Sequence, residues 1–294
     1  MNALTWAIGD LTVHRVDELC EPVFPIELFI EGLPEGAVAR NLDWLAPDYI
    51  DPKTMNAIMS DHSWVIKTPH HNILIDTCWG NNKPRPDYGG DLNTPWLDRL
   101  AAHGLQPEDI DFVMCTHLHA DHVGWNTRLI DGRWVPTFPN ARYLFGRTDY
   151  DYWSTATNVQ YGHDIAFQDS VLPCVEAGLA DLVDGGYALG DMVIMEDAPG
   201  HTAGNMVISA RSQGYTGMFS GDVFHAPIQL AFPGSNSVAC SLPDQARATR
   251  RALLDECAEH GHVLFPGHFP PPSCGRVSHQ GEGFRFHPFA PSGG

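Results

Sequence analysis

The stretch His117-Leu118-His119-Ala120-Asp121-His122 sets four metal-ligand side chains within six positions, immediately after the apolar run Phe112-Val113-Met114-Cys115. The run predicts a short buried strand, because a brief apolar run bounded by polar residues is typical of a strand covered on both faces. In proteins of strands and helices, ligand-binding residues gather in loops at the carboxyl ends of strands. We therefore expect the histidine-rich stretch to form a ligand loop at the edge of a sheet.

The spacing within this stretch predicts two metal ions. In an extended segment alternate side chains point the same way, so His117 and His119 can reach one ion together. Asp121 and His122 follow at once and project to the other side of the loop as the chain turns, where a second ion fits. We expect Gly124 to permit that turn.

Three further ligand-type residues follow a glycine at the ends of later predicted strands, in Pro199-Gly200-His201-Thr202, Ser220-Gly221-Asp222 and Pro266-Gly267-His268. The candidate metal ligands are thus His117, His119, Asp121, His122, His201, Asp222 and His268. Neutral imidazole and carboxylate suit zinc, and manganese, iron and cobalt stay open because affinity alone does not choose among these ions. The sequence predicts two divalent metal ions, with zinc as the first choice.

The composition limits the partners. Seventeen Lys and Arg against 36 Asp and Glu give a formal net charge of −19, which repels phosphate backbones and anionic lipid. No stretch has the length of an apolar membrane span, and the N-terminus lacks the basic start and apolar run of a signal peptide. The seven cysteines are scattered without C-x-x-C spacing, as expected for reduced packing residues. We expect a soluble, cytoplasmic protein that acts on a small molecule, with no nucleic acid or membrane partner.

Short strands with interspersed helices, and no repeat or low-complexity linker, predict a single α/β domain with two sheets over residues 1–294. Its core is expected at about 10–270, with an N-terminal excursion at 20–60 and a tail rich in Pro, Gly and His. The Pro-rich excursion fits an intramolecular lid or the contact surface of a homodimer. The expected elements include a hairpin of strands 63–68 and 72–76 and a mostly helical segment at 165–182.

As a set, these residues resemble the pattern of the metallo-β-lactamase superfamily: an Asp after an early strand, then H-x-H-x-D-H, then a later His, Asp and His. The early residue is Asp76, at the end of the expected hairpin. The resemblance covers roughly residues 10–270 and implies a four-layer αββα sandwich with the metals at one edge between the sheets. It implies that Asp76 orients a ligand or the ligand loop, while a simple strand-end cap is the alternative role.

The resemblance also implies how the ligands divide. One ion would be held by His117, His119 and His201, the other by Asp121, His122 and His268, and Asp222 would bridge the two.

The segment Gly221-Asp222-Val223-Phe224-His225-Ala226-Pro227-Ile228-Gln229 is similar to the G-D-x-x-H-x-x-x-Q pattern of the methyl parathion hydrolase-like branch, which includes lactonases and esterases. Many acyl-homoserine lactonases place a tyrosine three residues after the bridging Asp, where it helps to polarise the lactone carbonyl. This chain has His225 at that position. His225 is therefore either a donor to the substrate or a residue that orders the site.

These features predict a hydrolase in which a hydroxide bridging two metals attacks a carboxylic ester or lactone. Asp121 is expected to pass the proton to the leaving oxygen, so Asp121, Asp222 and His225 are the candidate catalytic residues. A phosphotriester is the nearest alternative substrate, because the same nucleophile serves it. Functions as a β-lactamase, thioester hydrolase or di-iron redox protein rank below both.

Overall fold

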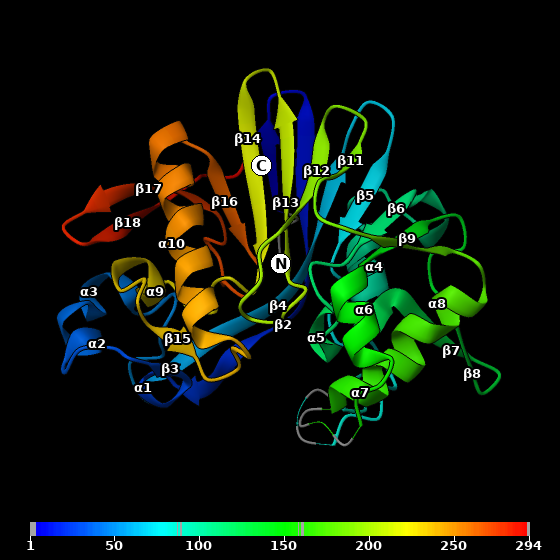
Figure 1. The fold of residues 1–294 in the computed structure, drawn as a ribbon, viewed down its shortest axis with the longest axis horizontal. Coiled ribbons are helices and arrows are strands. Elements are labelled where there is room, and N and C mark those ends of the chain that lie inside the picture. The colour runs from blue at the N-terminus through cyan, green and yellow to red at the C-terminus, as the bar shows by residue number, and fades with distance from the viewer. Residues whose placement is uncertain (1–3, 87, 89, 158, 160–161, 293–294) are drawn as a thin grey trace. The chain divides into compact units, whose positions relative to one another are not determined.

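The chain, in a computed structural model, folds into two compact units (Figure 1). The structure describes residues 4–86, 88, 90–157, 159 and 162–292. The first unit comprises Met1–Glu18, Asp61–Tyr187 and Pro291–Gly294, and the second comprises Leu19–Ser60 and Ala188–Ala290. The single domain over residues 1–294 stays a prediction.

A seven-stranded mixed sheet has the order β1-β2-β4-β5-β6-β9-β10 and is built mostly from the first unit. Its strands are β1 (Thr5–Ile8), β2 (Leu11–Pro25), β4 (Asn56–Lys67), β5 (Asn72–Ile75), β6 (Phe112–Met114), β9 (Arg142–Gly146) and β10 (Ala180–Val183). β4 and β5 pair antiparallel, which confirms the expected hairpin, whereas β5, β6, β9 and β10 pair in parallel.

The parallel strands are short and apolar because both of their faces are covered. Leu74 in β5 and Val113 in β6 have no exposed surface. Neighbouring parallel strands run in the same direction, so β5 and β6 deliver the residues that follow them to the same edge of the sheet. Those residues are Asp76 and the ligand loop at 116–122.

The first unit also holds short helices and a small two-stranded sheet: α4 (Trp96–Ala101), η1 (Pro107–Asp109), α5 (Ala120–Val123), η2 (Gly124–Asn126), β7 (Thr127–Ile130), β8 (Arg133–Pro136), α6 (Arg147–Trp153), α7 (His163–Ala166), η4 (Phe167–Val171) and α8 (Leu172–Glu176). The helical segment expected over 165–182 is therefore too long at its C-terminal end. It stops because Gly178 adopts a φ of +71° in the turn after α8, and the following residues pair with β9 as strand β10.

The second unit contains the other seven-stranded mixed sheet, in the order β11-β12-β13-β14-β16-β17-β18. Its strands are β11 (Tyr187–Leu189), β12 (Val193–Asp197), β13 (Met206–Ser212), β14 (Tyr215–Gly221), β16 (Val263–Pro266), β17 (Gly275–Gln280) and β18 (Gly283–Pro288). β14 and β16 are parallel neighbours, and β12, β13 and β14 pair antiparallel. Two mixed sheets with helices confirm the α/β class.

The C-terminal segment corrects the expectation of a tail. β17 and β18 form an antiparallel hairpin that adds two strands to the second sheet. Val277, Phe284 and Phe286 are buried, and they belong to the hydrophobic core of the second unit. The hairpin forms because these apolar side chains gain burial there, despite the surrounding Pro, Gly and His residues.

The excursion at 20–60 is a packed part of the second unit. Ile26, Phe29 and Leu45 are buried in the same core as the helix α10. The remaining elements of this unit are α1 (Ile26–Phe29), β3 (Ile30–Glu31), α2 (Ala37–Arg40), α3 (Leu42–Leu45), α9 (Ile228–Ala231), β15 (Asn236–Ser237) and α10 (Pro243–His260). In the described part of the chain, no helix has both the length and the apolar composition needed to cross a bilayer.

Candidate metal centre

The ligand loop of the first unit brings its four predicted ligands together. The rings of His117 and His119 lie 4.6 Å apart between centroids, and those of His117 and His122 lie 4.0 Å apart. His122 Nε2 is 3.5 Å from a carboxylate oxygen of Asp121. The three histidines are buried, whereas Asp121 is partly exposed. We call these four residues the first ligand cluster.

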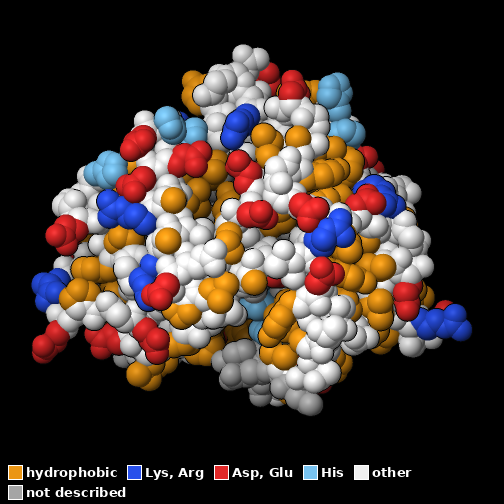
Figure 2. All heavy atoms as spheres, in the orientation of Figure 1, with side chains coloured by type: hydrophobic (Ala, Val, Ile, Leu, Met, Phe, Trp, Pro, Cys, Tyr) orange, Lys and Arg blue, Asp and Glu red, His pale blue; other side chains and the backbone are white. Residues whose placement is uncertain are grey.

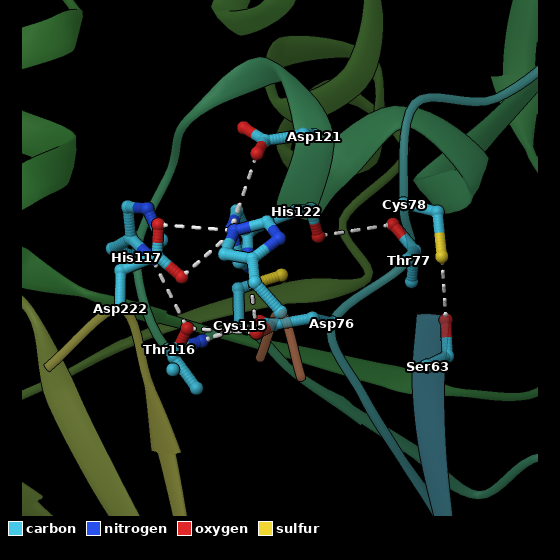
Figure 3. Close-up of polar contacts among 12 residues, drawn as sticks. Ser63, Asp76, Thr77, Cys78, Cys115, Thr116, His117, Asp121, His122 and Asp222 are labelled. Atoms are coloured by element: carbon cyan, nitrogen blue, oxygen red, sulfur yellow. Dashed lines mark hydrogen bonds and ion pairs between the residues drawn. The ribbon is translucent and has the colours of Figure 1, made fainter. Parts of the chain in front are cut away.

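Asp76 orients the first ligand cluster (Figure 3). One of its carboxylate oxygens accepts a hydrogen bond from the Thr116 amide at 2.7 Å. The other accepts from the Thr116 hydroxyl and from His122 Nδ1, both at 2.8 Å. His122 therefore carries a proton on Nδ1, so Nε2 is its candidate ligand atom, as in the arrangement by which a carboxylate orients a metal-binding histidine. Asp76 thus bonds both a predicted ligand, His122, and the backbone of the ligand loop.

The same bonds fix the protonation of His117. The Thr116 hydroxyl uses its single proton toward Asp76, so at the 3.1 Å contact with His117 Nδ1 it is the acceptor. His117 Nδ1 is then protonated, and Nε2 is the nitrogen with a lone pair for a metal ion.

Three alternate backbone amides of the ligand loop donate to side chains from three different elements. The amide of Thr116 donates to Asp76, and that of Leu118 to Asp149 in α6 at 3.1 Å. The amide of Ala120 donates to His163 Nδ1 in α7 at 3.0 Å. Asp149 and His163 were missed by the sequence analysis, because neither lies in a motif or near the loop in sequence.

His163 also contacts a predicted ligand directly. Its ring stacks on that of His119, with centroids 4.0 Å apart and planes 16° from parallel. Trp153 contacts both rings in T-shaped arrangements, with its ring centroid 5.4 Å from that of His119 and 5.6 Å from that of His163. Burial lowers the pKa of His163 to about 4, so the ring is neutral near pH 7.

Gly124 occupies the end of the ligand loop for a reason other than the one expected. Its φ of −58° is ordinary helical backbone, so the turn itself does not require glycine. A Cβ at this position would lie 1.8 Å from the carbonyl oxygen of Trp79. The glycine therefore permits close approach of two backbone segments, which the short loops after β5 and β6 require.

The second unit gathers the other predicted ligands around one carboxylate. One oxygen of Asp222 lies 3.2 Å from His201 Nε2 and 3.2 Å from His225 Nε2, and the other lies 3.1 Å from His268 Nε2. All four side chains are buried. Asp222 and His268 follow the parallel neighbours β14 and β16, which explains why their side chains meet. We call these four residues the second ligand cluster.

The glycines that precede these ligands allow tight packing. A Cβ on Gly267 would lie 3.1 Å from a carboxylate oxygen of Asp222, and one on Gly200 would lie 2.3 Å from the Cα of Ala246. Gly200 also has a φ of +148°. The repeated glycine in the sequence thus marks places where the backbone passes close to a ligand or to helix α10.

The loop after Asp222 is fixed by two buried side chains. Gln229 accepts hydrogen bonds from the amides of His225 and Ala226, at 2.8 and 3.1 Å. Arg250 of α10 donates to the Val223 carbonyl at 2.9 Å, and it also donates to Ser235 and Asn236. Burial lowers the pKa of His225, which contacts the edge of Phe29 at 5.7 Å between ring centroids. His225 is thus placed against Asp222 as a neutral imidazole.

Both clusters have the donor chemistry of divalent metal ligands. Each combines several imidazoles with a carboxylate, in surroundings where an unneutralised carboxylate is costly. Within the first unit, His117 and His122 have their Nδ1 atoms bonded to protein oxygens, so Nε2 is the candidate coordinating atom of each ring. The residues present fit zinc and its neighbours in the first transition row.

Comparison with known proteins shows the family of the chain. The family model for the metallo-beta-lactamase superfamily matches residues 60–268, more than half of the chain. Metallo-beta-lactamase domain-containing protein 1 of Xenopus laevis is 29% identical over 188 residues, covering 62% of this chain and 65% of that protein. The N-acyl homoserine lactonase AttM of Agrobacterium fabrum is 32% identical over 78 residues, 24% of this chain and 26% of that protein. The chain thus spans less than two thirds of either relative.

Solved structures share the fold over nearly the whole chain. The hydrolase AbOPH of the beta-lactamase superfamily is 21% identical, with a TM-score of 0.84 over 99% of this chain and 98% of that one. AidC, a dizinc quorum-quenching lactonase, is 23% identical, with a TM-score of 0.75 over 99% of each chain. The metallo-β-lactamase fold expected from the sequence is confirmed. The chain therefore belongs to the metallo-beta-lactamase superfamily.

Proposed function

We propose that the protein is a hydrolase that uses two divalent metal ions, with zinc the first choice, to cleave a carboxylic ester or lactone. The observation that carries the proposal is Asp222, a buried carboxylate that meets three imidazole nitrogens at 3.1 to 3.2 Å. Burying a carboxylate costs free energy unless its charge is compensated, and bound cations would supply that compensation.

The predicted ligands would divide between two ions. By the family's pattern, one ion would be held by His117, His119 and His201, the other by Asp121, His122 and His268, with Asp222 shared. All seven residues lie within the stretch matched by the family model. When bound, two such ions supply an activated water and a Lewis acid for the substrate oxygen.

The protein side chains would perform the remaining steps. Asp76 and Thr116 keep the protons of His122 and His117 on Nδ1, away from the ligand atoms. Asp121, whose side chain is 16% exposed, would receive the proton of the attacking water and give it to the leaving oxygen. His225 stands in the position where many lactonases have tyrosine, and it would either order the site through its 3.2 Å contact with Asp222 or turn its N–H toward the substrate carbonyl oxygen.

An ester or lactone is favoured over other substrates by the relatives and by the surroundings of His225. AttM and AidC are named as lactonases. Phe29 packs against the His225 ring, and Phe24 stacks on Phe29 at 5.1 Å. These apolar rings suit an uncharged substrate with a hydrocarbon portion.

The surface charge supports a small substrate. On the face seen in Figure 2, Lys and Arg side chains stand among Asp and Glu, and the described residues there form no continuous basic stripe. With a formal charge of −19, a polyanionic nucleic acid would be repelled. The absence of a nucleic acid partner and an intracellular site of action stay predictions.

A phosphotriester is the second candidate substrate, because His225 in place of tyrosine moves the site away from the homoserine-lactonase pattern. A phosphoryl oxygen and a carbonyl oxygen would both be stabilised by a Lewis acid and by a hydrogen-bond donor. Initial rates with a lactone, an aryl ester and an aryl phosphotriester would rank the substrate classes. Negligible turnover of all three by metal-loaded protein would refute the proposed function.

Replacement of the shared ligand tests the site. Asp222→Asn should lose both bound metal, measured by elemental analysis, and at least about 100-fold in kcat/KM. Asp244→Asn is the matched control, because Asp244 lies in the same unit with a side chain that is 99% exposed. Full activity of a metal-free Asp222→Asn protein would contradict the assignment.

A further inference from the structure

The hydrogen bond at Ala120 fixes the protonation of a histidine outside the ligand set. A backbone amide can only donate, so His163 Nδ1 must accept with a lone pair. The imidazole of His163 is therefore neutral and carries its proton on Nε2.

His163 reaches two ligands at once. Ala120 lies between His119 and Asp121 in the chain, so a bond to its amide restrains the backbone on which both side chains stand. The ring of His163 stacks on that of His119, and Trp153 contacts both rings in T-shaped arrangements. His119 is thereby held against rotation of its ring, which would otherwise turn its nitrogens away from an ion.

A direct ligand role for His163 does not fit these contacts. One nitrogen of His163 lies within 4.8 Å of ligand atoms of His119 and Asp121. However, Nδ1 is committed to the Ala120 amide, and Nε2 bears the proton, so neither nitrogen offers a lone pair to a cation. Two rings stacked 16° from parallel also cannot both point a nitrogen at one ion between them.

We propose that His163 is a positioning residue that orients His119 and Asp121 for metal binding, through its acceptor Nδ1 and its stacked ring. The proposal rests on the proposed function, because it assumes that His119 and Asp121 hold metal ions. By the family's division of ligands these two residues serve different ions. His163 would therefore tune both metal positions from a single side chain.

Variants that separate the two contacts provide the test. His163→Phe keeps an aromatic ring but removes the acceptor, which leaves the Ala120 amide without its partner. His163→Asn removes the ring but can place its amide oxygen where Nδ1 lies. His70→Phe is the control, because His70 is exposed in the turn between β4 and β5 of the same unit.

The readouts are the zinc affinity of the metal-free protein, by competition with a chromophoric chelator, and the visible spectrum of the cobalt-substituted protein. We expect His163→Phe to bind zinc about 10–100-fold more weakly and to show an altered cobalt spectrum. His163→Asn should recover most of the affinity, and His70→Phe should match the wild type. Circular dichroism and thermal melting of each variant establish that it is folded.

Nitrogen-15 spectra of histidine in the metal-free protein add a second measurement, in which His163 should show the neutral form protonated on Nε2. A proton on Nδ1, or wild-type zinc affinity and cobalt spectrum in folded His163→Phe, would overturn the proposal. The proposed function fails separately, when wild-type protein binds two metals and hydrolyses none of the substrate panel. The positioning role would survive that outcome.

Discussion

Replacement of Asp76 by asparagine tests the link between hydrogen bonding and metal affinity most directly. The carboxamide oxygen of the substituted side chain can still accept from the Thr116 amide, so the loop keeps one of its bonds. The new NH2 group, however, faces His122 Nδ1, which is a donor in the wild type at 2.8 Å. Two donors cannot bond, so the proton of His122 is driven from Nδ1 to Nε2, the nitrogen that should bind the metal ion.

The expected loss follows from the bonds that change. Asp76 makes two short contacts through the affected oxygen, to the Thr116 hydroxyl and to His122. Loss of such a partner of a metal-binding histidine typically costs about 10–100-fold in metal affinity. That range corresponds to about 1.4 to 2.7 kcal/mol in binding free energy. Metal binding must also first move the His122 proton back, so we expect the upper part of the range.

The assay is a zinc competition titration of metal-free wild type and Asp76→Asn, with histidine nitrogen-15 spectra to locate the His122 proton. The matched control is Asp111→Asn, because Asp111 bonds the amide of Asn72 at the other end of β5. That variant should bind zinc as the wild type does. Unchanged zinc affinity in Asp76→Asn, with the proton still on Nδ1, would refute the reasoning.

Two further predictions concern stability. Burial raises the pKa of Glu18 to about 7 from 4.5, so the folded state keeps a proton that the unfolded chain has released. The free energy of unfolding should fall by at most about 3 kcal/mol as pH rises from about 4.5 to about 7. In urea unfolding measured across this pH range, Glu18→Gln should show a smaller fall in the free energy of unfolding than the wild type. An equal fall in both proteins would contradict the raised pKa of Glu18. Arg250→Met should lower the free energy of unfolding by on the order of 3 kcal/mol, because it leaves buried carbonyls such as that of Val223 without a donor. Urea unfolding measures this free energy, and a loss below about 1 kcal/mol would contradict the role of Arg250 in fixing the loop after Asp222.

The sequence by itself determined the local parts of the candidate site. The apolar run at 112–115 predicted a strand and the ligand loop after it, because both the apolar pattern and the ligand spacing extend over only a few consecutive residues. The Asp76 hairpin and the glycines before His201, Asp222 and His268 were found for the same reason. The family pattern then joined these separate pieces, although it did not identify the substrate.

Only the tertiary structure decided which side chains hold the ligand loop. Asp149 and His163 bond amides that lie 31 and 43 residues away in the chain, and no local spacing encodes such a pairing. The C-terminal hairpin was missed likewise, because its strands gain stability by joining a sheet formed by distant residues. Side-chain acceptors for loop amides and the burial of edge strands depend on what the rest of the chain brings beside them. The acceptors of the loop amides and the C-terminal hairpin therefore depend on which residues lie close together in space, and separation along the sequence does not measure that distance.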